Sequence, residues 1–276
     1  MSTPGVVLGA SGFLGSRLVE NYPDALIPGP RLKAHTAADL AVFEGILDSF
    51  LDEVPTHAIV NCIGLREGTD EQLTLANQFI PRVVVDVAAK RSVRVIHIGS
   101  AAELVSAREG VDPEVARPLL KYSKSKKAGA REVLRYDQAV VARIHNLHGL
   151  PHQPSSGLHS LCLAIKKISE HQQPLQSPVI DVTRDYIHWQ AALAEVRAIV
   201  DKDIEGIIEI RSGISLSLHA IVEKLPIELQ NQLLRNLAPP DILTNVPDGN
   251  DSAPTLGSTT AKAAELADEV LTCVSS

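Results

Sequence analysis

Short apolar segments alternate with longer helical patterns through the first half of this chain. The apolar segments, rich in valine and isoleucine, are GVVL (5–8), ALI (25–27), HAIVNCI (57–63), VRVIHI (93–98) and AVVARI (139–144). They read as continuous apolar runs, which is typical of strands buried on both faces of a parallel sheet. The sequences between them are long enough to form crossover helices. The alternation therefore predicts an α/β fold with a doubly wound parallel sheet.

A glycine turn follows the first apolar segment. In GASGFLG (9–15), Gly9, Gly12 and Gly15 stand between GVVL and the helical pattern of SRLVENY. In such a strand–turn–helix unit the first glycine permits the tight turn and the second lets the backbone approach a pyrophosphate. The third allows close packing of the helix on the strand, and the phosphates lie against the helix N-terminus. The turn therefore predicts a Rossmann-type site for a dinucleotide.

The residues beyond the second apolar segment bear on which nicotinamide cofactor binds. NAD-specific sites usually carry an acidic residue about 20 residues after the glycines, where it binds the ribose. The corresponding segment here, PGPRLKAH, has no carboxylate and carries Arg31 and Lys33 instead. A cation suits a 2′-phosphate, so the sequence favours NADP(H), and NAD(H) remains the alternative. The other interpretation is that both residues are ordinary solvated charges.

The pattern changes after about residue 146. A loop-like stretch, LPHQPSSG, leads into an amphipathic helix, and a strand at 206–210, a helix with a serine cap and a last helix follow. We therefore expect a smaller C-terminal lobe beside the Rossmann domain. The dinucleotide-binding domain is expected to span 1–145, with 175–205 returning to it, and the C-terminal lobe to span 146–174 and 206–276.

Composition and charge exclude several classes of protein. Hydrophobic residues make up 45% of the 276, which predicts a sizeable buried core. The net charge of −7 comes with no basic stripe, so we expect no nucleic-acid partner. Three widely separated cysteines, Cys62, Cys162 and Cys273, favour a reducing compartment over a disulfide framework. Because neither a signal peptide nor a run of about 18 apolar residues is visible, we expect a cytoplasmic protein with no membrane partner.

A tyrosine and a lysine four residues apart lie in a helical pattern. Tyr122 and Lys126, in YSKSK, are expected one turn apart on one face of a helix. A neighbouring ammonium favours the phenolate, so we expect Lys126 to lower the pKa of Tyr122 and to donate to ribose hydroxyls. Ser100 ends the segment VIHIGS, and the carboxyl ends of parallel strands share one rim with the glycine turn. Its hydroxyl is suited to hydrogen-bond a substrate oxygen, and a simple strand-end turn is the alternative.

Histidines are concentrated in RIHNLHGLPH. His145, His148 and His152 fall within eight residues, a density that is compatible with a metal ion. No cysteine or carboxylate joins them at ligand spacing in the sequence. We therefore expect no metal site in this segment or in the rest of the chain.

Together these motifs resemble the extended short-chain dehydrogenase/reductase family of the NAD-dependent epimerase/dehydratase type, whose members mostly act on nucleotide sugars. GASGFLG matches the dinucleotide turn, AIVNCIG (58–64) the segment near the cofactor, and LANQFIP (75–81) a helix that carries an asparagine. The resemblance runs over most of the chain, and it implies that the C-terminal lobe, 146–174 and 206–276, is a substrate-binding lobe. The residues expected to bind the cofactor are Gly9, Ser11, Gly12, Phe13, Leu14, Gly15, Arg31, Cys62, Ile63, Gly64, Asn77, Tyr122 and Lys126.

Two later segments match the family as well. RIHNLHG (143–149) resembles its R-x-x-N-x-Y-G stretch, which implies that Asn146 contacts a substrate phosphate. His148 stands where that stretch has its tyrosine. TRDYIHW (183–189) resembles the R-D-[YF]-I-H-V segment, which implies that Arg184 helps to bind a nucleotide diphosphate.

Ser100, Tyr122 and Lys126 fall on the catalytic serine, tyrosine and lysine of the family. The resemblance therefore implies hydride transfer between NADP(H) or NAD(H) and a nucleotide-activated sugar, and in particular the reduction of a 4-keto-6-deoxy sugar. In that reaction Tyr122 gives its proton to the carbonyl oxygen, Ser100 holds that oxygen as a substrate contact, and Lys126 holds the nicotinamide ribose. Members of the family commonly form dimers, so we expect a homodimer.

Departures from the family pattern narrow the set of reactions that the resemblance implies. The 4,6-dehydratase branch carries Asp-Glu after the catalytic serine or threonine, whereas this chain has Ala101 and Ala102, so dehydration is not expected. Glu103 lies one place out of register and is interpreted as a helix-start charge. Two alternatives to a ketoreductase remain, namely an epimerase that retains NAD and a non-catalytic cofactor-binding sensor or scaffold.

Overall fold

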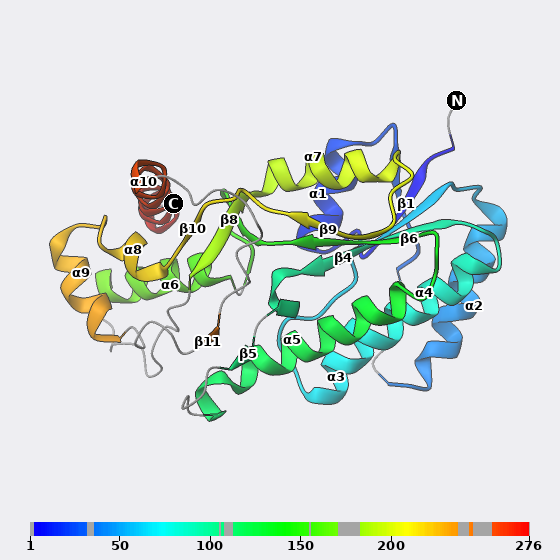
Figure 1. Ribbon diagram of the computed structural model, residues 1–276, viewed down its shortest axis with the longest axis horizontal. Coiled ribbons are helices and arrows are strands. Elements are labelled where there is room, and N and C mark those ends of the chain that lie inside the picture. Colours follow the sequence, from blue (N-terminus) through cyan, green and yellow to red (C-terminus); the bar gives the residue numbers. More distant parts are fainter. Residues whose placement is uncertain are drawn as a thin grey trace. The chain divides into compact units, whose positions relative to one another are not determined.

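The structure is a computed structural model. It describes residues 3–31, 36–104, 106–107, 113–154, 156–170, 183–236, 243–244 and 256–275. The chain divides into two compact units, which are described separately below. The first comprises Met1–Glu103, Pro118–Ile144 and Leu193–Ile210, and the second comprises Leu104–Arg117, His145–Ala192 and Arg211–Ser276. Figure 1 labels the helices and strands of both.

The first unit is built on a six-stranded parallel sheet in the order β2-β1-β3-β4-β6-β9. Its strands are β1 (Gly5–Leu8), β2 (Leu26–Pro28), β3 (Ala58–Asn61), β4 (Arg94–Ser100), β6 (Ala139–Ile144) and β9 (Gly206–Ile210). The predicted parallel α/β sheet is therefore confirmed. Because β2 and β3 lie on opposite sides of β1, the chain order switches direction at β1. Ligands of such sheets bind beyond the carboxyl ends of the strands at this switch point, where the glycine turn follows β1.

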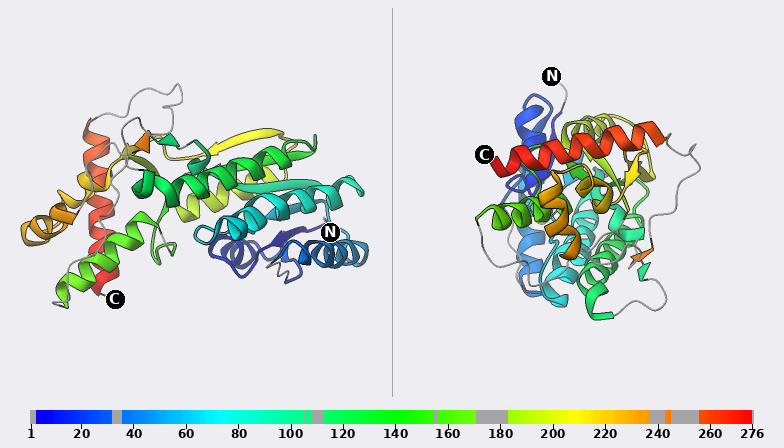
Figure 2. Two further views of the ribbon diagram at one scale, coloured as in Figure 1. Left: turned by 90° about the horizontal axis from the view of Figure 1, so that it is seen from below. Right: turned by 90° about the vertical axis from the view of Figure 1, so that its left-hand side faces the viewer.

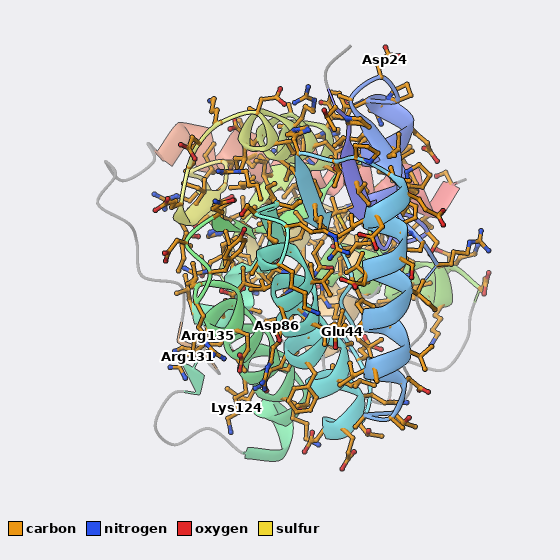
Figure 3. All side chains as sticks on the ribbon, turned by 90° about the vertical axis from the view of Figure 1, so that its right-hand side faces the viewer. Asp24, Glu44, Asp86, Lys124, Arg131 and Arg135 are labelled. Carbon is orange, nitrogen blue, oxygen red and sulfur yellow. The ribbon has the colours of Figure 1, made fainter. Side chains whose placement is uncertain are left out.

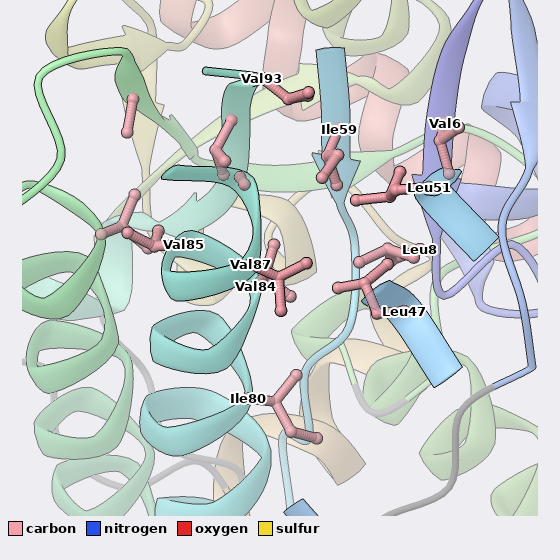
Figure 4. Close-up of a cluster of buried hydrophobic side chains, with 14 of the residues drawn as sticks. Val6, Leu8, Leu47, Leu51, Ile59, Ile80, Val84, Val85, Val87 and Val93 are labelled. Carbon is pink, nitrogen blue, oxygen red and sulfur yellow. The ribbon is translucent and has the colours of Figure 1, made fainter. Parts of the chain in front are cut away.

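Helices cover both faces of this sheet (Figure 1). One face carries α1 (Phe13–Asn21) and the first unit's part of α7 (Trp189–Val200), and the other carries α2 (Asp39–Glu53), α4 (Ile80–Ala89) and the first unit's part of α5 (Pro113–Val133). Leu47 of α2 and Val84 of α4 pack against Val6 and Ile59 of the strands in one buried cluster (Figure 4). Apolar residues recur at intervals of four along α2, which gives this helix the stripe that faces the core.

Helix α5 packs closely on the segment that precedes α4. This segment consists of α3 (Asp70–Thr74) and a π-helical turn, η1 (Leu75–Phe79). A Cβ atom on Gly129 of α5 would lie 1.8 Å from the carbonyl oxygen of Asn77 in η1, so only glycine fits at this position. The short 3-10 turn η2 (Ala101–Leu104) follows β4 and ends this part of the unit.

The second unit contains a three-stranded sheet in the order β10-β8-β7. β7 (Asn146–His148) and β8 (Arg184–His188) are parallel, whereas β10 (Ser215–Leu216) is antiparallel to β8. The two-residue strands β5 (Ser106–Ala107) and β11 (Leu243–Thr244) form a separate antiparallel pair. The apolar runs of the sequence did not predict these strands, because none of them is a continuous apolar run; β8, for example, is RDYIH.

Helices form most of the core of the second unit. They are α6 (Gly157–Ser169), α8 (Leu218–Val222), α9 (Ile227–Leu233), η3 (Leu234–Asn236) and α10 (Leu256–Ser275). Leu161 of α6 and Leu266 of α10 belong to one buried cluster, and Figure 2 shows α10, in red, beside α6. The predicted serine cap is confirmed, since Ser217 Oγ accepts a hydrogen bond from Ala220 N at 3.1 Å.

The two units and the domains expected from the sequence differ in three segments. Residues 183–192 were expected to return to the dinucleotide-binding domain but belong to the second unit, as does Leu104–Arg117, which was expected within 1–145. The third difference concerns β9. The sequence-based boundaries place 206–276 in the second lobe, whereas Gly206–Ile210 pairs with β6 and completes the first sheet. A late apolar run does not show which sheet it joins, because the pairing partner is distant in the sequence. Which ligand each unit binds stays a prediction.

Charged side chains cover the outer helices of the first unit. Glu44 of α2, Asp86 of α4, and Lys124 and Arg131 of α5 are labelled in Figure 3. Over the described ranges, no helix combines the length and the apolar character that crossing a membrane requires.

We expect Gly129→Ala to destabilise the protein by about 1–3 kcal/mol, because the added methyl group overlaps the Asn77 carbonyl. Gly45→Ala is the matched control. Gly45 is an exposed residue of α2 at which a Cβ atom meets nothing within 4 Å, so alanine there stabilises by up to about 1 kcal/mol. Urea unfolding of both variants measures the difference. Equal effects would contradict the close contact between α5 and η1.

Candidate active site

The glycine turn has the geometry that its spacing predicts. Gly9 has φ = +75°, a conformation that side chains disfavour, and Gly12 N donates to Gly9 O at 2.9 Å. A Cβ atom on Gly15 would lie 2.3 Å from Gly9 O. The first turn of α1 therefore packs directly on the turn, and no other residue fits at Gly15.

This turn fits the pyrophosphate of a dinucleotide. Gly12 is the N-cap of α1, and no side chain of the described residues caps this helix, so the cap leaves its first N–H groups unoccupied. Ser11 and Gly12 are exposed, and Phe13 and Leu14 are partly buried. An uncapped helix N-terminus suits phosphate oxygens, because the N–H groups and the helix dipole both favour negative charge.

The segment that follows β3 lies against the glycine turn. Cys62 N donates to Leu8 O at 3.0 Å, and a Cβ atom on Gly9 would lie 3.0 Å from the backbone of Cys62 and of Ile63. Asn61 Oδ1 accepts a hydrogen bond from Ile63 N at 3.1 Å. Burial raises the pKa of the Cys62 thiol to about 12, so this cysteine is neutral. The structure thus brings three predicted cofactor residues, Gly9, Cys62 and Ile63, together.

Asn77 ties this segment to α5. The Asn77 amide donates to Leu65 O at 2.7 Å and to Ser125 Oγ at 2.9 Å, and its Oδ1 accepts from Leu65 N at 2.8 Å. A Cβ atom on Gly64 would lie 3.2 Å from Asn77 Oδ1 and 4.0 Å from Lys126 Nζ. Asn77 is fully buried, so it acts as a positioning residue for Gly64 and its neighbours. A direct cofactor contact of Asn77 stays a prediction.

Ser100, Tyr122 and Lys126 lie together at the carboxyl end of β4. Ser100 is the last residue of β4, and its side chain is hydrogen-bonded to that of Tyr122. Tyr122 and Lys126 lie one turn apart on α5, as predicted. Lys126 is 4% exposed, and its Nζ donates to Ile98 O at 2.7 Å. The first unit therefore assembles all three predicted catalytic residues on the edge of the sheet that also carries the glycine turn.

Burial dominates the titration of this group. It raises the pKa of Tyr122 above its ordinary value, although the hydrogen bond from Ser100 opposes this shift. Burial also lowers the pKa of Lys126, to about 8, against the opposing effect of the Glu103 charge. The expectation that the pKa of Tyr122 is lowered is therefore wrong. The Lys126 ammonium donates to the carbonyl of Ile98, and desolvation of the phenol decides the direction of the shift.

Glu103 is not the helix-start charge that the sequence suggested. It is 1% exposed, its Oε1 accepts from Ser100 N at 2.8 Å, and its Oε2 accepts from Arg143 Nε at 3.0 Å. Arg143 also pairs with Glu209 at 2.6 Å. The register of β4 and β6 sets Gly99 opposite Arg143, and a Cβ atom on Gly99 would lie 2.8 Å from Glu103 Oε1. Glu103 is therefore a buried positioning residue for the backbone of Ser100.

Asn61 and His97 are further residues of this site to which the sequence assigned no role there. Both are fully buried, Asn61 Nδ2 lies 3.2 Å from His97 Nδ1, and His97 Nε2 lies 3.4 Å from Lys126 Nζ. Burial and the Lys126 charge hold the pKa of His97 well below its ordinary value, so His97 is neutral. The signal available in the sequence was a polar residue at the end of an apolar strand, which Asn61 shares with Ser100.

Arg31 lies just after β2 and is exposed. The backbone before it is fixed, because Gly29 N donates to Val7 O at 2.9 Å. Residues 26–31 contain no carboxylate, as the choice of NADP(H) requires. Lys33 lies outside the described residues, and the choice between the two cofactors stays a prediction.

Asn146 and Arg184 begin neighbouring strands of the second unit. Asn146 pairs with Tyr186 of β8, and Arg184 is the first residue of β8. Asn146 Nδ2 donates to Asp185 O at 3.3 Å, and both Asn146 and Arg184 are partly buried. The second unit therefore brings these two residues together, and their contact with a substrate stays a prediction.

The histidines of RIHNLHGLPH have partners that their spacing did not reveal. His148 Nδ1 donates to Glu269 Oε2 at 3.0 Å, and His152 Nε2 donates to Glu269 Oε1. His152 Nδ1 lies 3.1 Å from Cys162 Sγ. Glu269 is on α10 and Cys162 is on α6, so only the fold of the second unit joins a carboxylate and a cysteine to these rings.

A parallel sheet, a glycine turn after β1 and a serine, tyrosine and lysine at the carboxyl edge define a Rossmann-type protein of the short-chain dehydrogenase/reductase class. The model of the NAD dependent epimerase/dehydratase family matches residues 6–206. The chain belongs to this family, and the resemblance seen in the sequence is confirmed. No curated protein matches the chain.

Solved structures share the fold at low sequence identity. RMD from Pseudomonas aeruginosa, complexed with NADPH, is 18% identical with a TM-score of 0.65 over 99% of each chain. WbmG from Bordetella bronchiseptica, in complex with NAD and UDP, is 18% identical with a TM-score of 0.62, over 92% of this chain and 85% of that one. The dTDP-4-dehydrorhamnose reductase from Bacillus anthracis, in complex with NADP, is 14% identical with a TM-score of 0.60. The match covers 87% of this chain and 83% of that one.

We expect Glu103→Gln to lower the free energy of unfolding by about 3 kcal/mol, because it leaves the buried part of Arg143 without its carboxylate. Glu209→Gln removes the other carboxylate of the same arginine. The Glu209 side chain is 35% exposed, so its loss should cost less than about 1 kcal/mol. Urea unfolding of the two variants measures both values. If both variants lose the same free energy of unfolding, Glu103 is not the dominant partner of Arg143.

Proposed function

We propose that this protein is an NADP(H)-dependent oxidoreductase that reduces the keto group of a nucleotide-activated 4-keto-6-deoxy sugar. The observation that carries the proposal is the assembly of Ser100, Tyr122 and Lys126 at the sheet edge that carries the glycine turn. Membership of the epimerase/dehydratase family supports the use of a nicotinamide dinucleotide. The related folds in complex with NAD and UDP, and with NADPH, support the class of substrate and of cofactor.

Ser100, Tyr122 and Lys126 each have a separate role in the reduction. The nicotinamide dinucleotide, when bound, supplies the hydride for the carbonyl carbon. Tyr122 donates a proton to the carbonyl oxygen, and its raised pKa keeps the phenol protonated at neutral pH, as a general acid requires. Ser100 holds the same oxygen by a hydrogen bond. The Lys126 ammonium stabilises the negative charge that develops there and that passes to the phenolate.

Other residues hold the two ligands in place. The glycine turn and the first N–H groups of α1 bind the pyrophosphate of the cofactor, and Arg31 binds its 2′-phosphate. Asn146 and Arg184 of the second unit bind the diphosphate of the substrate. Binding energy from these groups positions the sugar without changing the charge at the reacting carbon. A homodimer and a cytoplasmic location stay predictions.

We expect the wild type to consume NADPH faster than NADH with dTDP-4-keto-6-deoxyglucose, and Tyr122→Phe to reduce kcat at least about 100-fold, because the proton donor is lost. Tyr136→Phe is the matched control, since the Tyr136 hydroxyl donates to Val93 O at 3.1 Å and has no part in the proposed chemistry. The absorbance of the reduced nicotinamide measures turnover.

The same assay separates the alternatives. Turnover that survives in Tyr122→Phe would contradict the assigned acid. If neither cofactor is consumed but the denatured protein releases NAD, an epimerase replaces the reductase. If no dinucleotide is released and none binds, the oxidoreductase proposal fails.

We expect kcat/KM for reduction to fall as the pH rises through about 8, because Lys126 then loses its proton in the free enzyme. The Glu103 charge raises the pKa of Lys126, so Glu103→Gln should move this limb of the profile to lower pH. Glu209→Gln is the control, because it removes the other carboxylate partner of Arg143, and it should leave this limb at the same pH. A limb that responds equally to both variants, or to neither, would contradict the effect of the Glu103 charge on the pKa of Lys126.

A further inference from the structure

Three metal-binding side chains of the second unit lie close together. They are His152, in the segment after β7, Cys162 of α6, and Cys273 in the last turn of α10, and we call them the His–Cys–Cys cluster. One ring nitrogen and two sulfur atoms lie within 4.8 Å of one another. His152 and Cys162 are 5% and 4% exposed, whereas Cys273 is partly exposed. The cluster is therefore a largely buried donor set that solvent reaches at Cys273.

The orientation of His152 is fixed by Glu269. His152 Nε2 donates to Glu269 Oε1, so Nε2 carries the ring proton and the lone pair of Nδ1 faces Cys162 Sγ at 3.1 Å. The Glu269 carboxylate is itself held by Gly149 N at 2.8 Å and by His148 Nδ1 at 3.0 Å. A carboxylate that binds the distal nitrogen of a histidine is the arrangement that orients and polarises histidine ligands of zinc.

We propose that the His–Cys–Cys cluster binds one Zn²⁺ ion through His152 Nδ1, Cys162 Sγ and Cys273 Sγ, with water as the fourth ligand. Tetrahedral zinc with bonds of about 2.3 Å to sulfur and 2.0–2.1 Å to nitrogen places its ligand atoms about 3.5–3.8 Å apart. This range lies between the 3.1 Å contact and the 4.8 Å limit of the cluster, so small side-chain shifts accommodate the ion.

The charges and protons of this site balance. Each cysteine loses one thiol proton on binding, so two protons leave for each zinc ion, and two thiolates cancel the charge of the ion. The histidine stays neutral, and Glu269 keeps the proton on Nε2. Soft sulfur ligands with one imidazole select zinc over calcium, magnesium or manganese.

Other uses of the same residues are disfavoured. A catalytic thiolate has to be exposed and readily deprotonated, whereas Cys162 is buried and burial raises the pKa of its thiol. A Cys162–Cys273 disulfide would consume both sulfur ligands and would leave the oriented Nδ1 of His152 without a function. The disulfide is nevertheless a distinct outcome that the experiment below detects.

The proposed ion has a structural role. Its ligands come from the segment after β7, from α6 and from α10, and apolar residues such as Leu161 and Leu266 already pack between the two helices. Zinc would therefore join α10 to α6 and to the segment after β7. Because an ion that binds only the folded state stabilises it, zinc should raise the midpoint of thermal unfolding.

The first experiment measures metal directly in the full chain. The protein is reduced with a phosphine and loaded with zinc sulfate, and excess zinc is removed by gel filtration. Elemental mass spectrometry then measures the zinc content per chain. We expect one zinc ion per chain, and loss of this ion in Cys273→Ser, Cys162→Ser and His152→Gln. Cys62→Ser is the matched control, because it removes the cysteine of the first unit and should leave the zinc content unchanged.

A second measurement tests the geometry. With Co²⁺ in place of zinc, the wild type should show the thiolate charge-transfer absorption that Cys273→Ser lacks. Glu269→Gln should weaken zinc binding by about 10- to 100-fold while the ligands remain. Because Cys273 is partly exposed, Cys273→Ser is the variant that best preserves the fold, and circular dichroism checks that it does.

Three results would overturn the proposal. The first is substoichiometric zinc in the reduced wild type. The second is zinc content that Cys273→Ser and Cys62→Ser affect equally, with both variants folded. The third is a metal-free protein that loses two titratable thiols on purification and regains them on reduction, which would establish a disulfide instead.

Discussion

The contact between the Asn77 carbonyl and Gly129 determines how closely α5 approaches the helical segment after β3. At this separation the Asn77 amide reaches Ser125 Oγ at 2.9 Å, one residue before Lys126. The same amide holds the backbone of Leu65, so the segment next to the glycine turn is tied to the helix that carries the tyrosine and the lysine. A side chain at position 129 would move α5 outward and lengthen the bond between Asn77 and Ser125, which joins α5 to this segment. The position of the candidate catalytic helix therefore depends on the absence of one methyl group.

Lys126 is a buried cation, and its surroundings explain why it stays titratable near neutral pH. Burial alone drives the pKa of a lysine down, and the nearby Glu103 charge limits the fall to about 8. Glu103 is buried as well and is compensated by Arg143, and Arg143 is compensated in turn by the half-exposed Glu209. Charges of alternating sign thus lead from the interior lysine to the surface. The two buried charges nearest the surface, Glu103 and Arg143, pair with each other, and the Lys126 ammonium donates instead to a backbone carbonyl and is influenced by the Glu103 charge.

Local patterns predicted what depends on local sequence. The apolar segments are strands, the glycine turn has the expected backbone geometry, and Ser100, Tyr122 and Lys126 fall at a strand end and on one helix. Glu103 was misread because its partner, Arg143, is set beside it by the register of β4 and β6, which no local pattern records. The lowered pKa expected for Tyr122 failed for a related reason. A spacing of four residues says that an ammonium is near, but it does not show that burial outweighs it.

His148 stands where the family pattern has a tyrosine, and its contacts explain how a histidine is accommodated. His148 Nδ1 donates to Glu269, and Lys262 Nζ lies 2.7 Å from His148 Nε2, so a neutral imidazole satisfies a carboxylate and an ammonium on opposite sides of one ring. A phenol has a single polar atom for both. Burial alone would raise the pKa of Glu269, but the hydrogen bonds from His148, His152 and Gly149 N outweigh it and lower the pKa. The departure at His148 and the orientation of His152 therefore follow from one ionised carboxylate on α10, which makes the substitution and the His–Cys–Cys cluster parts of the same network.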